Sequence, residues 1–303
     1  MPRSCNLIID SCCDLPLDLI QGRDGVTIMN FCYILDNVVY PDDFFQTRSV
    51  KEFYDLLRNG AMPTTSQVSP KVLEQTFREA CAAGTPTVYL SMSSGISSNY
   101  SSACMIADKV KQDFPLSELY VVDSLVGCTP EGLLVLEAIN QMEAGLSAKE
   151  LTEWLKEARF RTYIQFMVDD LDTLHRGGRV PGSVAVMGGA LNIKPLLTFD
   201  TEGKLTLTGA ARGRKKALKS IASFFAENRE PEHHQVLIGN ADAPKDAEAL
   251  KAAILEVDPD AQIIIHTVGT TIGSHTGPGM VSVGFWGPSR KEPTKKGLFG
   301  RKK

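Results

Sequence analysis

The sequence lacks long hydrophobic runs, C-x-x-C cysteine pairs and a strong excess of charge of either sign. No stretch of 18 apolar residues occurs among its 303 residues, which excludes an apolar membrane-spanning helix. A formal net charge of −4 argues against a nucleic-acid-binding protein, which would need a local basic surface. The seven cysteines form no C-x-x-C pair, which argues against a disulfide framework and a zinc site. Since the sequence also shows no secretory signal, we expect reduced thiols in a cytoplasmic protein.

Motifs of several enzyme classes are missing as well. The chain has no P-loop motif G-x-x-x-x-G-K-[ST], no G-x-G-x-x-G after a strand and no H-E-x-x-H. It also lacks the nucleophile elbow G-x-S-x-G of the α/β-hydrolases. We therefore expect no metal and no cofactor, and any ATP chemistry would have to come from another protein.

The first half of the chain alternates apolar runs with helical segments. Three runs of strand type, residues 7–9, 87–90 and 119–122, each lead into a polar turn and then a helix. Four helix starts carry capping signals: Ser49-x-x-Glu52, Ser69-Pro70, Thr129-Pro130 and Ser147-x-x-Glu150. Continuously apolar strands separated by helices predict a mostly parallel sheet covered on both faces. We expect an N-terminal layered α/β domain over residues 1–160.

The second half mixes hairpin and crossover connections. Six strands are predicted, at residues 163–168, 195–199, 204–208, 236–238, 263–265 and 281–285. The turn at residues 200–203 marks a hairpin, and helices are predicted over residues 215–227 and 243–255. We expect a C-terminal α+β domain with a mixed sheet over residues 161–287. Residues 288–303 should form a disordered basic tail, because from Arg290 onwards seven Lys or Arg stand against one Glu.

Small hydroxyl residues follow the predicted strands of the first half. They are Ser11, Ser93, Ser94 and Ser124. Ligands of open α/β sheets bind outside the carboxyl ends of the strands, so these residues should share one crevice. The alternative for each is that it simply caps the next helix. Residues 91–98 hold more hydroxyls than one cap needs, which favours a cradle for a small anion at a helix N-terminus.

Other segments add polar side chains that suit an anion. Residues 62–70 are dense in hydroxyls, and residues 272–279 place His275 among three glycines. Arg176 and Arg179 bracket two further glycines, and Arg212 and Arg214 belong to a second basic cluster. Arginine can contact a phosphate or carboxylate, but a solvated surface is the more common setting.

Several separated motifs occur together along the chain. They are Asp10-Ser11 with Asp14-Leu15-Pro16, Thr65-Ser66-Gln67, Ser93-Ser94-Gly95 with Tyr100, Val122-Asp123-Ser124, Gly132-Leu133-Leu134, Gly177-Gly178-Arg179, Asn192-Ile193-Lys194-Pro195 and Gly273-x-His275-Thr276-Gly277-Pro278-Gly279. In these motifs residues 5–286 resemble the DegV family of bacterial fatty-acid-binding proteins, which includes the carrier subunit of fatty acid kinase. The resemblance implies two α/β domains with a long-chain fatty acid held between and within them.

The resemblance also implies roles for single residues. The residues that would meet the fatty-acid carboxylate are Thr65, Ser93 or Ser94, and His275, with Ser11, Ser66, Ser124 and Thr276 in support. The residues that would contact a phosphate or a partner protein are Arg179, Arg212 and Arg214. Cys12-Cys13 departs from the family, which usually has a hydroxyl and a small residue there, and we interpret both cysteines as small buried hydrophobes.

Two main classes of function compete at this point. The first is a carrier, not itself an enzyme, that binds a long-chain fatty acid non-covalently and presents its carboxylate to a fatty acid kinase subunit for acyl-phosphate formation. The second is a serine hydrolase or acyltransferase with Ser93 or Ser94 as nucleophile and His275 as base. The missing elbow and the resemblance favour the carrier over this enzyme and over a phosphotransfer protein that uses Arg179 and Arg212. The basic tail is either a solvated extension or a transient tether to a membrane surface.

Overall fold

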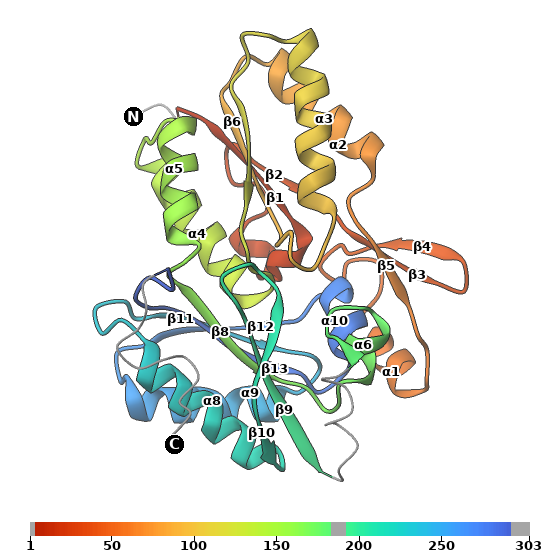
Figure 1. Cartoon of the computed structure of the whole chain (residues 1–303), viewed down its shortest axis with the longest axis vertical. Helices are drawn as coiled ribbons and strands as arrows, with labels where there is room; N and C mark the ends of the chain where they lie inside the picture. Colours follow the sequence, from red (N-terminus) through yellow and green to blue (C-terminus); the bar gives the residue numbers. More distant parts are fainter. Residues whose placement is uncertain (1–3, 183–191, 292–303) are drawn as a thin grey trace.

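The computed structural model describes residues 4–182 and 192–291. Two sheets organise the chain, and Figure 1 shows them in the upper and lower halves of the molecule. None of the described helices is long and apolar enough to cross a membrane.

The first sheet is four-stranded and parallel, in the order β2-β1-β6-β7. Its strands are β1 (Asn6–Asp10), β2 (Val26–Met29), β6 (Thr87–Ser91) and β7 (Leu119–Asp123). Helices α2 (Pro70–Ala82) and α3 (Asn99–Asp113) cover one face, and α4 (Thr129–Glu143) and α5 (Ala148–Ala158) cover the other (Figure 1). Along β1, Leu7 and Ile9 pack on the α4 side and Ile8 on the α2 side. The predicted parallel α/β layer is confirmed.

The second sheet has six strands in the order β10-β9-β8-β13-β11-β12. Its strands are β8 (Thr162–Met167), β9 (Ile193–Phe199), β10 (Leu205–Arg212), β11 (Gln235–Asn240), β12 (Gln262–Thr267) and β13 (Val281–Trp286). Only β11 and β12 pair in parallel, so the predicted mixed sheet and its β9–β10 hairpin are confirmed. Helices α8 (Arg214–Asn228) and α9 (Pro244–Val257) pack against this sheet. The predicted domain boundary at residue 160 falls in the turn between α5 and β8 and stays a prediction.

Helix α4 joins the two sheets. It contacts β1 of the first sheet and β8, β11 and β13 of the second. Leu133, Leu134 and Val135, three successive residues of α4, are all fully buried. This stretch of α4 is apolar all round and therefore buried on all sides, and α4 takes this position because each sheet needs a cover for one face.

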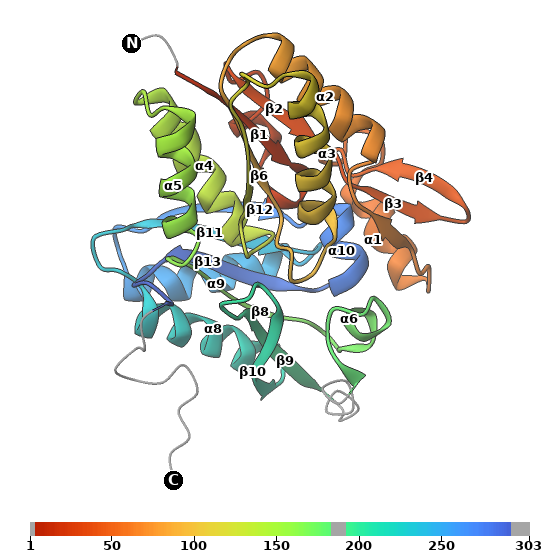
Figure 2. The ribbon, with the colours of Figure 1, turned by 45° about the horizontal axis from the view of Figure 1, so that its top comes forward.

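A third, small sheet was not predicted. Strands β3 (Cys32–Leu35), β4 (Val38–Pro41) and β5 (Thr64–Ser66) pair antiparallel in the order β4-β3-β5, and they project to one side in Figure 2. The β3–β4 turn places Asp36 and Asn37 at positive φ, which these residue types tolerate. Part of the hydroxyl-rich segment at residues 62–70 is therefore strand β5. Helix α1 (Val50–Arg58) lies between β4 and β5 in the chain.

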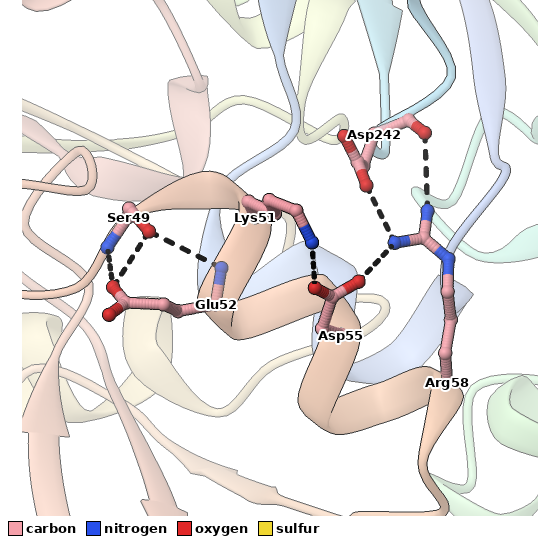
Figure 3. Close-up of polar contacts among 6 residues, drawn as sticks. All are labelled: Ser49, Lys51, Glu52, Asp55, Arg58 and Asp242. Atoms are coloured by element: carbon pink, nitrogen blue, oxygen red, sulfur yellow. Dashed lines mark hydrogen bonds and ion pairs between the residues drawn. The ribbon is translucent and has the colours of Figure 1, made fainter.

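The capping signals are confirmed at three of the four predicted helix starts. Ser49 and Ser147 form capping boxes, and Figure 3 shows the Ser49–Glu52 box of α1. Ser69 caps α2 by accepting the Val72 N–H. The predicted cap at Thr129 is wrong: Thr129 is the first residue of α4, and its hydroxyl lies 3.0 Å from the Ser282 hydroxyl on β13.

The first four residues of the predicted tail pack on the body of the protein, which corrects the predicted start at residue 288. Arg290 is only 8% exposed, and its guanidinium donates to the carbonyls of Phe199, Asp200 and Arg159. The Pro288 carbonyl accepts a hydrogen bond from the Tyr163 hydroxyl at 2.9 Å. The remainder of the predicted tail, residues 292–303, lies outside the described residues.

Candidate functional site

A cavity of about 150 Å³ lies between the two large sheets. Most of its lining is apolar and comes from both halves of the chain: Phe31, Met92, Ile96, Gly127, Cys128, Ile164, Phe166, Leu174, Phe199, Leu205, Ile272 and Met280. Its polar lining is Thr65, Gln67, Ser97, Ser98, Arg179, Thr271, His275 and Thr276. A mostly apolar cavity with a few converging polar groups is typical of a small-molecule site.

The polar lining centres on a pair made by Thr65 and His275. Thr65 lies on β5, and His275 lies near the end of α10 (Thr270–Thr276); the Thr65 Oγ1 and His275 Nε2 atoms are 2.7 Å apart. Gly177 packs directly on the imidazole, since a Cβ at this position would lie 2.3 Å from His275 Nδ1. Burial, with Arg179 and Arg176 adding positive charge, lowers the pKa of His275 to about 4. The imidazole is therefore neutral at pH 7 and offers one N–H donor.

Ser93 and Ser94 were predicted to meet the carboxylate, but neither residue lines the cavity. The Ser93 hydroxyl is fully buried, donates to the Gly203 carbonyl at 2.8 Å and accepts the Gly95 N–H. Ser94 is exposed, and its N–H donates to Asp123. Ser97 and Ser98 of the same loop line the cavity instead. Sequence analysis identified this loop, and its assignment of Ser93 or Ser94 to the carboxylate stays a prediction that the lining does not support.

The predicted supporting residues have mostly structural partners. The Ser11 hydroxyl accepts the Phe31 N–H, Ser66 donates to the Gln67 carbonyl, and Ser124 donates to the Val126 carbonyl. None of these three lines the cavity. Thr276 does line it, and its hydroxyl donates to the Ile272 carbonyl one helical turn earlier.

The three predicted arginines lie in different settings. Arg179 lines the cavity, and its Nε donates to the Ile96 carbonyl at 3.1 Å, which ties it to the serine loop. Burial lowers the pKa of Arg179. Arg214 is held by Asp246, Asp169 and the Gly279 carbonyl, so its guanidinium holds parts of the second half together.

Arg212, at the end of β10, is exposed. Of the three arginines, it is therefore the one whose side chain is open to a partner protein.

Four buried carboxyl groups lie outside the cavity lining. They belong to Asp10, Asp14, Asp42 and Glu131. Burial raises the pKa of all four, that of Asp10 to about 6. Neither Glu131 oxygen has a hydrogen-bond partner among the described residues. Cys12 and Cys13 are completely buried beside these acids, which confirms their interpretation as small buried groups.

One group of side chains away from the cavity has the spacing of metal ligands. His234, Asp258 and Asp260 bring potential ligand atoms close together. Asp258, however, already accepts hydrogen bonds from Arg229 at 2.9 Å and pairs with His234 at the same distance. A cation is thus already paired with the buried carboxylate, and the group needs no metal to balance its charge.

Comparison with known proteins places the whole chain in one family. The family model described as "uncharacterised protein, DegV family" matches residues 4–287. A DegV domain-containing protein of Clostridium perfringens is 34% identical over 288 residues, which are 95% of this chain and 98% of that relative. A second relative, from Lactococcus lactis, is 34% identical over 227 residues, 75% of this chain and 78% of its own length.

Solved structures share the fold over nearly the whole chain. A DegV family protein from Thermus thermophilus, described for its fatty acid binding, is 31% identical with a TM-score of 0.81, covering 94% of this chain and all of its own. A stearic acid-binding protein from Eubacterium ventriosum is 25% identical with a TM-score of 0.81, over 92% and 97%. The fatty acid kinase B3 protein of Streptococcus pneumoniae, loaded with linoleic acid, is 20% identical with a TM-score of 0.82, over 94% and 100%, and shows the shared fold.

Proposed function

The chain belongs to the DegV family, and we propose that it binds one long-chain fatty acid non-covalently, with the acyl chain in the apolar cavity and the carboxylate at Thr65 and His275. The observation that carries the proposal is the Thr65–His275 pair at the polar part of a cavity whose other walls are apolar. The proposal agrees with two solved relatives, one described for its fatty acid binding and one as a stearic acid-binding protein.

The neutral imidazole suits a carboxylate ligand. If His275 Nε2–H donates to Thr65 Oγ1, the Thr65 hydroxyl proton is free to donate to the carboxylate. Ser97 accepts the Asn99 N–H at 3.2 Å, so its hydroxyl proton is available as a second donor. We therefore move the serine contribution from Ser93 or Ser94 to Ser97.

The acyl chain contributes most of the affinity in this arrangement. Burial of about fourteen methylenes at about 0.8 kcal/mol each contributes near 11 kcal/mol before the costs of association. Hydrogen bonds to a carboxylate contribute about 1.5–3 kcal/mol each. The apolar walls therefore retain the ligand, and the polar residues fix its orientation.

Extraction and mass spectrometry test the binding directly. The purified protein should yield about one fatty acid per chain after solvent extraction, with no covalent adduct on any serine. His275→Ala and Thr65→Val should weaken binding by about 1–3 kcal/mol. Ser66→Ala is the matched control, because the neighbouring Ser66 does not itself line the cavity and its hydroxyl donates to the Gln67 carbonyl. Protein that yields no fatty acid and binds none when it is added would refute the proposal.

Presentation of the carboxylate to a separate kinase is the second part of the proposal. The chain has no kinase motif, and one solved relative with the same fold is a fatty acid kinase B3 protein. Arg179 lies in the cavity, where it can balance the charge of an acyl phosphate, and Arg212 is exposed for a protein contact. Arg212→Glu should abolish phosphorylation by the cognate kinase and leave the fatty acid bound. Lys71→Glu, on the exposed side of α2, should change neither the phosphorylation nor the fatty acid content. Phosphorylation of Arg212→Glu at the normal rate would mean that the kinase docks elsewhere.

The described hydrogen bonds give no support to the alternative hydrolase or acyltransferase. Ser93 donates to Gly203 and His275 pairs with Thr65, so Ser93 and His275 do not form a nucleophile–base pair. We therefore propose the carrier alone.

A further inference from the structure

The helix that carries His275 begins at side chains from the other half of the chain. Helix α10 follows β12 of the second sheet, and its N-cap residue is Gly269, which has no side chain to accept the first N–H groups. The unpaired N–H groups at a helix start need acceptors, and at α10 these acceptors come from residues more than 200 positions earlier.

Asp42, which directly follows β4, takes the place of the missing cap. Its Oδ1 atom accepts the Thr270 N–H at 3.0 Å and the Thr270 hydroxyl at 2.8 Å. Its Oδ2 atom accepts the Thr271 N–H at 3.2 Å and the Ser11 hydroxyl at 3.3 Å. The carboxylate is fully buried, so no water competes for these bonds.

Asp14 holds the residue before the helix. Its Oδ1 atom accepts the Gly269 N–H at 2.9 Å, and a Cβ on residue 269 would lie 2.4 Å from that oxygen. On the same side of α10, the Tyr54 hydroxyl of α1 donates to the Val268 carbonyl at 2.6 Å. Arg58 at the end of α1 reaches Asp242 of the second half, as Figure 3 shows. These contacts attach α10 to the first half.

We infer that Asp42 and Asp14 are positioning residues for the His275 imidazole. Helix α10 has only seven residues, too few to be stable alone, so its orientation depends on what holds its ends. His275 lies at its far end, and its partner Thr65 is on β5, in the same half as Asp14 and Asp42. The two acids thus keep both members of the carboxylate-binding pair on one body, while the acyl walls come from both halves.

The titration of His275 in the ligand-free protein tests this inference without depending on the proposed function. Asp42→Asn replaces one acceptor oxygen by an NH₂ group and should loosen the start of α10. NMR of the His275 ring, assigned with His275→Asn, should then show its pKa rise from about 4 toward its ordinary 6.5, because the ring gains water. Arg176 and Arg179, the charged groups that also lower this pKa, are unchanged.

Asp43→Asn is the matched control. The neighbouring Asp43 carboxylate accepts N–H groups of Gln46 and Thr47 in an exposed loop and makes no contact with α10 among the described residues. It should leave the His275 titration unchanged. If Asp42→Asn does not fold, Thr270→Val, which removes only the hydroxyl bond to Asp42, decides the question with a smaller shift in the same direction.

A second readout separates positioning from a general effect on stability. The NMR signal of the carboxyl carbon of bound [1-¹³C]palmitate should shift in Asp42→Asn. In a His275→Ala background, Asp42→Asn should add no further shift. The substitution should lower the melting temperature in both backgrounds. This readout rests on the proposed function, whereas the titration does not. An unchanged His275 pKa in folded Asp42→Asn, or an equal palmitate shift with and without His275, would overturn the inference.

Discussion

Arg290 should be a key stabilising residue, although it begins a segment that by composition looks like a solvated tail. Its Nη1 atom donates to the Phe199 carbonyl at 3.0 Å and the Asp200 carbonyl at 3.1 Å, and its Nη2 atom donates to the Arg159 carbonyl at 3.1 Å. These bonds join Arg290 to the start of the β9–β10 turn, beside the cavity-lining Phe199, and to the end of α5.

The size of the effect follows from these contacts. Three charge-assisted hydrogen bonds contribute about 1.5–3 kcal/mol each, and the desolvation of a guanidinium that is 8% exposed offsets part of this sum. Arg290→Met keeps a side chain of similar length but removes all three hydrogen bonds, although the Asp200 carbonyl keeps the Gly203 N–H and the Arg159 carbonyl keeps the Thr162 hydroxyl. We expect the free energy of unfolding to fall by about 2–4 kcal/mol. Fatty acid should also dissociate faster, because Phe199 loses its support.

Urea unfolding of four variants measures this loss. Arg290→Met and a chain that ends at Gly287 should both unfold at clearly lower urea concentration. A chain that ends at Lys291 should match the full-length protein. Lys291→Met is the neighbouring control, since its ion pair with Glu157 is largely exposed and contributes about 0–1 kcal/mol. If the two truncated chains unfold at the same urea concentration, Arg290 is not the stabilising contact and the reasoning is refuted.

Three further predictions concern the serine loop, the buried acids and the tail. Ser93→Ala should lower the free energy of unfolding by about 1–2 kcal/mol, because the hydrogen bond to Gly203 is lost. Ser97→Ala should leave the free energy of unfolding unchanged and shift the NMR signal of the carboxyl group of a bound ¹³C-labelled fatty acid. The reverse result would assign the carboxylate contact to Ser93. Burial raises the pKa of Glu131 well above 4.5, so the unfolded state loses this proton first and stability falls as the pH rises above about 4.5. Glu131→Gln should therefore raise the melting temperature at pH 8 but not at pH 4, and equal gains at both would contradict a protonated carboxyl. Removal of residues 292–303 should leave the fatty acid content unchanged. If the truncated and the full-length protein sediment equally with anionic vesicles at low salt, the hypothesis of a membrane tether is excluded.

The sheet strands could be predicted because burial leaves a strong signal in the sequence. Leu7, Ile8 and Ile9 form a continuous apolar run, since helices cover both faces of β1. The capping boxes at Ser49 and Ser147 are equally local, because the residues that bond each other are three positions apart. Where the determining contacts lie within a few residues, the sequence pattern is enough.

The small β3–β4–β5 sheet has no such signal. Its strands have three or four residues each, and Val38 and Val39 on β4 are exposed rather than buried. The pairing of Tyr33 on β3 with Thr65 on β5 joins segments more than thirty positions apart. Only the packing of the whole chain decides that Thr65 belongs to a strand beside α10.

The polar residues of the site show a second limit. Asp42 was not predicted at all, because its partners Thr270 and Thr271 are distant in sequence and nothing local marks it. Arg214 was predicted to meet a partner, but Asp169 and Asp246 already hold it. In both cases the role of the side chain depends on which groups the fold places against it.

Whether a hydroxyl can bind a ligand follows from the rule that buried polar groups need hydrogen-bond partners. Ser93 lies just after a strand end, as predicted, but its hydroxyl donates its hydrogen bond to the carbonyl of Gly203, which comes from the second half. Ser97, four residues later, has its hydroxyl as acceptor for the Asn99 N–H and keeps a proton to donate. A residue of the right type at the right edge of a sheet is thus a ligand only if the fold leaves one of its hydrogen-bonding groups unused. In this chain the hydroxyls divide on that basis: Ser93 joins the two halves that form the cavity, and Ser97 and Thr65 line the cavity, where we propose that they meet the carboxylate.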